Sequence, residues 1–358
     1  MNPLLQVRQF GQQIWLDNLS RTLLNDGHLA RFINEDGVTG ITTNPAIFHK
    51  AISGGRYYED DLAGLKQQPM SAEARYEGLV IPDVQRACDL LAPLFRDSGG
   101  EAGYVSLEVS PALAHDAAGT LAAGLRLKAA VNRPNLLIKV PATRAGLLAI
   151  EELVAAGISV NVTLMFSLTH VDTVAQAYVR GLERLRAQGG DLRSVMSVAS
   201  LFLSRVDTLV DKQLEALAAD TPARPGRTAV ALARLAYQRY RARFHGEGFA
   251  NLRAAGARPQ YMLWASTGTK NPAYSDLLYV EPLIGAETVN TLPDATLDAL
   301  RDHGKAAATL ELELDQAQAQ FATLAAAGID LEAAGERLQQ EGLAQFEQAF
   351  SALLELTA

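Results

Sequence analysis

Eight short runs of β-forming residues alternate with longer amphipathic stretches, and this alternation limits the possible folds more than any other feature of the sequence. Each run ends at Pro, Asn, Ser or Gly, and a helical pattern follows it. Strands that alternate with helices are typical of a parallel sheet. Eight such units in a chain of 358 residues predict a closed (β/α)8 barrel of the α/β class. The runs lie at residues 14–16, 40–43, 104–109, 136–140, 159–164, 195–201, 260–266 and 277–280.

An open doubly wound sheet is the alternative arrangement, but neither a Gly-x-Gly-x-x-Gly sequence after the first run nor a Walker A loop is present. The long intervals at 45–103 and 203–259 leave room for additional helices. Residues 294–358 are rich in Ala, Gln, Glu and Leu, and we expect them to form a helical C-terminal extension that packs across the barrel. No low-complexity linker interrupts the chain, so residues 1–358 are predicted to form a single domain.

The composition excludes several classes of protein. Asp and Glu outnumber Lys and Arg by 40 to 32, and a net charge of −8 without a basic run disfavours nucleic-acid or anionic-membrane binding. The sequence contains no run of 18 apolar residues, so no membrane span is predicted. A single cysteine, Cys88, cannot form an internal disulfide, which suits a reducing compartment, so we expect a cytoplasmic protein. The six histidines show no paired ligand spacing, and no metal site is predicted.

The strands carry polar side chains on the face that points into the predicted lumen. Successive side chains of a strand point to opposite faces, so Glu108 opposes its valine and leucine neighbours, and Lys139 opposes Ile138 and Val140. Ionisable groups in a lumen are costly unless they are paired or functional. The lumen set at the C-terminal halves of the strands, where barrel enzymes have their active sites, comprises Asn44, Glu108, Lys139, Asn161 and Thr163.

Lys139 is the one lysine of seven that lies within a strongly apolar strand. Burial disfavours the ammonium ion, and a neutral amine can attack a carbonyl to form a Schiff base. Imine formation expels water and needs a proton shuttle, for which Glu108 and Asp17 are the candidates. Three alternatives stay open: a structural Lys139–Glu108 ion pair, Asp17 as a helix N-cap, and Arg205 as a solvated helix residue.

Eight longer sequence segments match the motifs of a known enzyme family and contain the candidate site residues named above. The sequence closely resembles the transaldolases, of the longer bacterial type, from about residue 10 to residue 300. The segments that carry the resemblance are WLDNLSR (15–21), GITTNPAIF (40–48), VSLEVSP (105–111), LLIKVPAT (136–143), ISVNVTLMFS (158–167), VASLFLSRVD (198–207), WASTGTKNPAYSD (264–276) and YVEPLIGAETVNTLP (279–293).

The resemblance implies a class I, Schiff-base enzyme of the non-oxidative pentose phosphate pathway. Such enzymes transfer a dihydroxyacetone unit from sedoheptulose 7-phosphate to glyceraldehyde 3-phosphate, which gives erythrose 4-phosphate and fructose 6-phosphate, and they use no metal or organic cofactor. By this resemblance Lys139 forms the imine and Asp17 is the acid and base for the carbon–carbon bond. Glu108 and Thr163 together orient the catalytic water.

The resemblance also implies a set of substrate-binding residues. Asn44 and Asn161 match residues that hold the donor hydroxyls, Ser200 lies beside them, Phe202 matches an aromatic residue of the pocket, and Arg205 matches a phosphate ligand.

One position departs from the family pattern. Shorter transaldolases have a second phosphate-binding arginine after the seventh strand, whereas this chain has Ser266 followed by Lys270. Either Lys270 supplies a point charge there, or Ser266 and backbone amides share the contact.

Two other functions remain as alternatives. The first is a fructose 6-phosphate aldolase-type lyase that uses the same lysine, and the second is a catalytically inactive barrel that acts as a binding protein. We expect sugar phosphates as the substrates and a monomer or a homodimer as the assembly.

Overall fold

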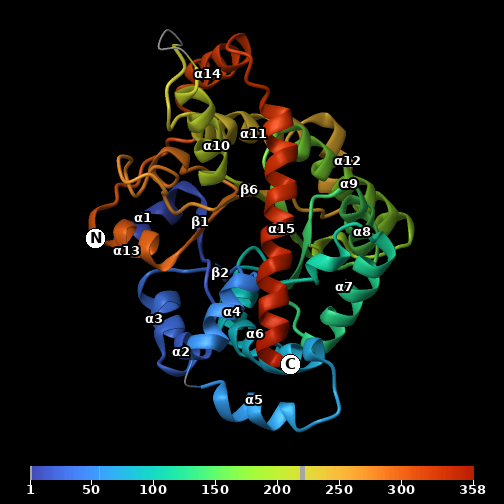
Figure 1. The fold of residues 1–358 in the computed structure, drawn as a ribbon. Helices are drawn as coiled ribbons and strands as arrows, with labels where there is room; N and C mark the ends of the chain where they lie inside the picture. Colours follow the sequence, from blue (N-terminus) through green and yellow to red (C-terminus); the bar gives the residue numbers. More distant parts are fainter. Residues whose placement is uncertain (1, 56, 218–221) are drawn as a thin grey trace.

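The computed structural model describes residues 2–55, 57–217 and 222–358. Eight parallel strands close into a barrel in the order of the sequence, with the last strand paired to the first (Figure 1). The predicted (β/α)8 barrel with additional helices is therefore confirmed. The strands are β1 (Gln12–Leu16), β2 (Gly40–Ile41), β3 (Tyr104–Glu108), β4 (Leu136–Pro141), β5 (Val160–Met165), β6 (Ser197–Phe202), β7 (Tyr261–Ala265) and β8 (Thr288–Leu292).

Helices surround the barrel, and the two long intervals of the sequence form extra helices as expected. The α-helices are α1 (Pro3–Val7), α2 (Arg21–Asn25), α3 (His28–Glu35), α4 (Pro45–Gly54), α5 (Glu59–Lys66), α6 (Ala72–Asp97), α7 (Ala117–Val131), α8 (Arg144–Ala155), α9 (Leu168–Ala187), α10 (Ser204–Glu215), α11 (Thr228–Phe244), α12 (Glu247–Ala254), α13 (Asp294–His303), α14 (Leu314–Ala326) and α15 (Leu331–Thr357). Short 3₁₀ turns are η1 (Arg8–Phe10), η2 (Pro111–Leu113), η3 (Leu192–Ser194) and η4 (Glu281–Leu283).

Small polar residues at the carboxyl ends of several strands begin the next helix. Asn44 follows β2, Thr143 follows β4 and Ser167 follows β5, and each side chain accepts a hydrogen bond from a backbone N–H in the first turn of the helix behind it. These caps satisfy donors that a helix start would otherwise leave unpaired. They hold the strand-to-helix turns, and hence the residues that the strands present at this end of the barrel.

The last strand lies eleven residues later than the sequence pattern predicts. Residues 277–280 are buried except for the half-buried Leu278, but they form a turn ahead of η4, and β8 is Thr-Val-Asn-Thr-Leu at 288–292. This strand has few apolar residues. Its polar side chains can be buried because they form hydrogen bonds inside the molecule, as when Asn290 donates to the Tyr279 carbonyl at 3.0 Å. The prediction of a strand at 277–280 is therefore wrong, since buried apolar residues were taken for strand residues.

The C-terminal helices pack on the barrel as expected. Helix α15 is 27 residues long, about 40 Å, and it crosses the carboxyl ends of the strands from α10 to α4 and α6 (Figure 1). Its buried apolar side chains belong to the same hydrophobic core as the barrel. No helix in the described part of the chain is long and apolar enough to span a membrane.

Candidate active site

A cavity opens at the carboxyl ends of the strands, beneath α15. We call it the front cavity. Most of the residues predicted for the site line it, namely Asp17, Asn44, Lys139, Thr163, Ser200, Phe202, Arg205 and Ser266. Two more predicted residues, Glu108 and Asn161, contact members of this wall. Residues from seven of the eight strands or their ends thus converge on one place.

Lys139 and Glu108 form a buried pair at the wall of the front cavity. They are register partners on β4 and β3, and the Lys139 Nζ lies 3.2 Å from Glu108 Oε2. The two side chains are only 5% and 6% exposed. Burial raises the pKa of Glu108, and the nearby Lys139 charge opposes this rise. A carboxyl group with a raised pKa next to an amine is suited to donate and accept protons.

Two further contacts fix the Lys139 amine. Its Nζ donates to the Thr43 carbonyl at 2.9 Å, and it lies 5.6 Å from the centre of the Phe346 ring. The ion pair with Glu108 exists, so the structural alternative is correct about the contact. A purely structural ion pair, however, would not require an open cavity, whereas Lys139 lines a cavity together with Asp17 and Thr163.

Asp17 lies directly after β1 and lines the front cavity. Its Oδ1 accepts a hydrogen bond of 2.7 Å from Thr42, whose hydroxyl also contacts Thr291 at 2.6 Å. Burial raises the pKa of Asp17, against the effect of the Thr42 hydrogen bond and the Lys139 charge. The N-cap of the next helix is Ser20. The alternative interpretation of Asp17 as a helix cap is therefore wrong.

A chain of amide and hydroxyl groups crosses the floor of the cavity. Ser200 donates to Asn161 Oδ1 at 2.7 Å, and Asn161 Nδ2 donates to Ser106 at 3.0 Å. Asn44 has a second task, because its Oδ1 caps α4 by accepting from the Ile47 N–H at 3.0 Å. These bonds hold the amides in fixed orientations, as recognition of sugar hydroxyls requires.

Two polar groups of the site are buried without a hydrogen-bond partner within the described residues. They are the Thr163 Oγ1 and the Arg205 Nη1. The Arg205 guanidinium carbon lies 5.6 Å from the centre of the Phe202 ring, and burial lowers the arginine pKa. A buried unpaired donor is costly, and polar groups of this kind point to a bound water or ligand. Arg205 lines the cavity, so its interpretation as a solvated helix residue is wrong.

Ser266 and Lys270 lie in different places. Ser266 has a left-handed backbone, with a φ of 54°, and its hydroxyl contacts the Ser204 hydroxyl at 2.8 Å on the wall of the front cavity. A left-handed backbone in a non-glycine residue is uncommon and is enriched at functional sites. Lys270 is exposed and lines a neighbouring surface hollow with Asp211. The structure thus brings Ser266 into the site and leaves Lys270 outside the front cavity.

Five lining residues are absent from the sequence prediction, namely Thr42, Leu263, Ala265, Thr291 and Phe346. Thr42 shares a strand face with Asn44, and this signal is visible in the sequence. Thr291 belongs to the strand that was misplaced. Phe346 lies on α15, about two hundred residues beyond Lys139, and no motif marks it.

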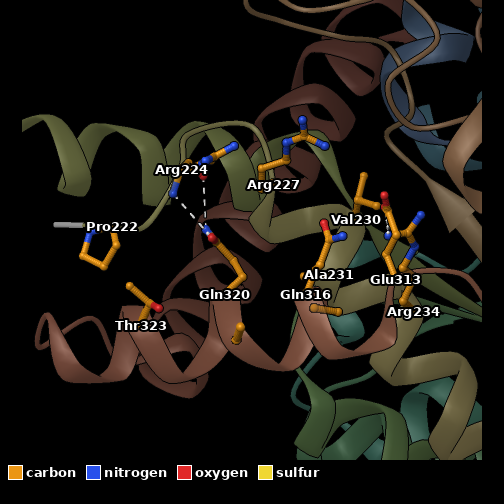
Figure 2. A pocket seen from close by; sticks show the side chains of 12 residues that line it. Pro222, Arg224, Arg227, Val230, Ala231, Arg234, Glu313, Gln316, Gln320 and Thr323 are labelled. Atoms are coloured by element: carbon orange, nitrogen blue, oxygen red, sulfur yellow. Dashed lines mark hydrogen bonds and ion pairs between the residues drawn. The ribbon is translucent and has the colours of Figure 1, made fainter.

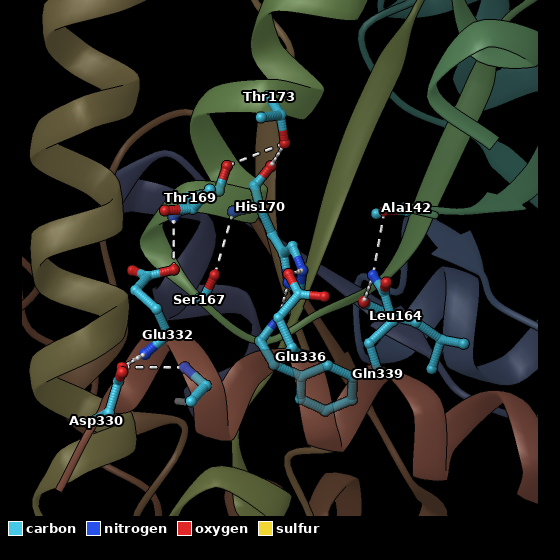
Figure 3. A network of polar contacts seen from close by, with 12 residues as sticks. Ala142, Leu164, Ser167, Thr169, His170, Thr173, Asp330, Glu332, Glu336 and Gln339 are labelled. Carbon is cyan, nitrogen blue, oxygen red and sulfur yellow. Dashed lines mark hydrogen bonds and ion pairs between the residues drawn. The ribbon is translucent and has the colours of Figure 1, made fainter. Parts of the chain in front are cut away.

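Helix α15 is fixed over the site by polar contacts with the strand ends (Figure 3). Gln339 is buried, and its Nε2 donates to the carbonyls of Ala142 and Leu164 at 3.1 and 3.0 Å. Glu336 contacts His170 Nε2 at 3.0 Å, and His170 Nδ1 accepts from the Phe166 N–H. Gln339 therefore ties the helix to the ends of β4 and β5, which carry Lys139 and Thr163.

Another surface cavity lies between α11 and α14, away from the barrel mouth (Figure 2). Arg224, Arg227 and Arg234 face it together with Glu313, and Gln320 bonds the backbone of Arg224. None of the predicted site residues lines this cavity, so it does not compete with the front cavity as the active site.

Comparisons with known proteins agree with the resemblance of the motifs. A family model described as Transaldolase/Fructose-6-phosphate aldolase matches residues 14–357. A transaldolase of Thiobacillus denitrificans is 55% identical over 355 residues, and one of Neisseria gonorrhoeae is 50% identical over 355 residues; each alignment covers 99% of both chains. Transaldolase 1 of Streptomyces coelicolor is 46% identical over 96% of this chain and 91% of its own. The family predicted from the motifs is thereby confirmed: the chain belongs to the transaldolase/fructose-6-phosphate aldolase family.

Proposed function

We propose that the protein is a transaldolase that works through a Schiff base on Lys139. It transfers a dihydroxyacetone unit from sedoheptulose 7-phosphate to glyceraldehyde 3-phosphate, and the products are erythrose 4-phosphate and fructose 6-phosphate. The observation that carries the proposal is the buried Lys139 amine, which contacts Glu108 and lines the same cavity as Asp17. The names of the relatives support the same activity.

The first step joins the donor to the enzyme. The Lys139 amine attacks the ketone carbon, and the hydroxyl of the resulting carbinolamine leaves as water after it takes a proton from Glu108. Thr163 has an unpaired hydroxyl nearby and orients this water. The imine is itself the electron sink for the next step, so the chemistry calls for no metal or organic cofactor.

The second step breaks the carbon–carbon bond. Asp17 accepts the proton of the C4 hydroxyl as the C3–C4 bond breaks, and the aldose product leaves. The electron pair of that bond stays on the three-carbon unit as an enamine. The acceptor aldehyde then adds to the same carbon, and Asp17 returns the proton to the new hydroxyl. The raised pKa of Asp17 fits a group that alternates between its two protonation states.

The remaining site residues bind and orient the substrate. Asn44, Asn161 and Ser200 offer amide and hydroxyl groups to the donor hydroxyls, and Phe202 closes one wall. The unpaired guanidinium nitrogen of Arg205 binds the phosphate, with Ser266 at the same wall. Binding energy from the phosphate positions the distant ketone at Lys139.

A fructose 6-phosphate aldolase is the second candidate, because the family name covers both activities. The two enzymes differ in the fate of the enamine, which a transaldolase passes to an aldehyde and an aldolase releases as dihydroxyacetone. A coupled assay with and without acceptor aldehyde separates them. We expect product only when the acceptor is present; steady release of dihydroxyacetone without acceptor would support the aldolase.

Borohydride reduction in the presence of fructose 6-phosphate tests the Schiff base. We expect a covalent adduct on Lys139, located by peptide mass spectrometry. Lys128 is the internal control, because burial lowers its pKa but its amine bonds backbone carbonyls away from the cavity. An adduct on Lys128, or no adduct at all, would support the inactive binding protein.

Lys139→Ala should fold and lose essentially all turnover. The substitution removes the nucleophile, and the buried Glu108 can take up a proton when its partner is gone, since its pKa is already raised. Circular dichroism checks the fold, and the coupled assay measures the activity. Substantial turnover by the folded variant would contradict the assignment of Lys139.

We also propose that the enzyme acts in the cytoplasm, as a monomer or a homodimer, on free sugar phosphates. The net charge of −8 and the single buried cysteine support this setting.

A further inference from the structure

A second cavity adjoins the catalytic pair from the side away from the substrate. It lies between α6, η2, α7 and the end of α15, and we call it the back cavity. Glu108 lines the back cavity but not the front one, whereas Lys139 lines the front cavity but not the back one. The Lys139–Glu108 pair is therefore part of the partition between two cavities.

The back cavity has polar groups at its two ends and apolar walls between them. At the outer end Arg126, half exposed, forms a two-fold ion pair with Glu77 at 2.6 and 2.7 Å. At the inner end lie Glu108 and the buried residue Tyr76. The space open to water is about 60 Å³. One water molecule needs roughly 10–15 Å³, so the cavity has room for a few.

Tyr76 is oriented by its neighbours and has a free hydroxyl. Its ring packs edge-on against Phe48 and Phe350, at centroid distances of 6.0 and 5.6 Å. Within the described part of the chain the hydroxyl has no hydrogen-bond partner. Burial raises the pKa of Tyr76, and the charge of Glu108 is the next largest cause, so the two groups are electrostatically coupled. A water between them would have the polar partners that a buried water requires.

The proposed reaction requires water to leave and to enter the site while the substrate occupies the front cavity. One water leaves when the imine forms and one enters when it is hydrolysed, while the sugar phosphate fills the front cavity. Water that reached the enamine carbon from the front would protonate it and end the transfer. A transferase therefore gains from a water path that reaches the imine carbon without crossing the substrate.

We propose that the back cavity is this path: water passes between solvent and the Schiff base along α6 and α7, past Tyr76, to Glu108. The inference rests on the proposed function. Helix α15 contributes to both sides, because Phe346 lines the front cavity and Phe350, one turn later, lines the back one. Tyr76 is a positioning residue that holds the water against Glu108 and does not touch the substrate.

Oxygen exchange measures the route directly. Each cycle of imine formation and hydrolysis replaces the C2 oxygen of fructose 6-phosphate with oxygen from water, so mass spectrometry in ¹⁸O-water gives the rate. Ala123→Leu places a larger side chain in the back cavity from α7. We expect exchange to fall about tenfold, which corresponds to ~1.4 kcal/mol in the barrier. The KM for fructose 6-phosphate should be unchanged, since the front cavity is untouched.

Ala122→Leu is the matched control, because Ala122 is the exposed neighbour on the same helix and should leave exchange at the wild-type rate. Ile81→Phe narrows the cavity from α6 and replaces Ala123→Leu if that variant does not fold. Borohydride trapping is run in parallel. An adduct on Lys139 with wild-type exchange in the folded cavity-filling variant would overturn the water path and leave the function standing. No adduct in the wild-type protein would remove both.

Discussion

Arg205 brings a guanidinium to the front cavity with one nitrogen buried and unpaired. A phosphate there would complete its hydrogen bonds, and a charge-assisted bond contributes about 1.5–3 kcal/mol. Arg205→Ala should therefore raise the KM for fructose 6-phosphate by about 10- to 100-fold in steady-state kinetics. Lys270→Ala should have a much smaller effect, since Lys270 lies outside this cavity. The reverse order would make Lys270 the phosphate ligand.

The buried residue Asp207 lies outside the front cavity, and its carboxyl group should make the stability of the protein depend on pH. Its carboxylate accepts from the Ala229 N–H at 2.8 Å and from the Tyr279 hydroxyl at 2.9 Å, yet burial raises its pKa to about 7. The neighbouring Asp211 charge contributes to this rise.

A raised pKa in the folded state adds stability at acidic pH. This contribution is largest below the unfolded value of 3.8, declines as the pH rises, and is gone above about 7. Asp207→Asn cannot ionise, so its melting temperature should fall less than that of the wild type between about pH 5 and pH 8. Equal slopes for the two proteins would show that Asp207 is not the group responsible.

Strand alternation predicts individual site residues well where a strand is correctly placed. Glu108 and Lys139 were assigned to the lumen by this rule, and they are register partners there. Thr291 was not predicted as a site residue, because the eighth strand was assigned to residues 277–280. The positions of Tyr76 and Phe346 depend on how helices pack, and strand periodicity carries no information about packing.

Among the elements, α15 is tied to the strand ends by one buried polar side chain, Gln339. Gln339→Met keeps the length of the side chain but leaves the carbonyls of Ala142 and Leu164 without their donor. Each unpaired buried acceptor costs about 1–3 kcal/mol, so the free energy of unfolding should fall by about 2–4 kcal/mol in urea denaturation. Gln340→Met, on the exposed side of the same turn, is the control. A loss of the same size in both variants would contradict the role of Gln339.

Helix boundaries were easier to predict than helix positions. Apolar residues recur at helical spacing from Thr228 to Phe244, and this pattern alone indicates the helix that the structure forms there as α11. The amphipathic pattern of residues 294–358 predicted helices that pack on the barrel. It did not show that α15 packs over the carboxyl ends of the strands. That position is determined by contacts with distant strand ends, such as the hydrogen bonds of Gln339.

The whole molecule should unfold as one unit if the C-terminal extension belongs to the barrel domain. Trp15 and Trp264 are fully buried in strands, whereas α15 contributes only to the helical signal. Tryptophan fluorescence and far-UV circular dichroism should therefore give coincident thermal transitions. A separate earlier loss of helical signal would show that the extension unfolds on its own.

The order of the chain along the barrel has a consequence for biosynthesis. Lys139 is translated about two hundred residues before Phe346, which covers its amine. Strands β5 to β8 and helix α15 all follow Lys139 in the chain, so the amine is accessible to the aldehydes and ketones of the cell until these elements fold around it. Premature stop codons ahead of α15 would leave that uncovered amine in place permanently, so such products are expected to accumulate carbonyl adducts as well as to lack turnover.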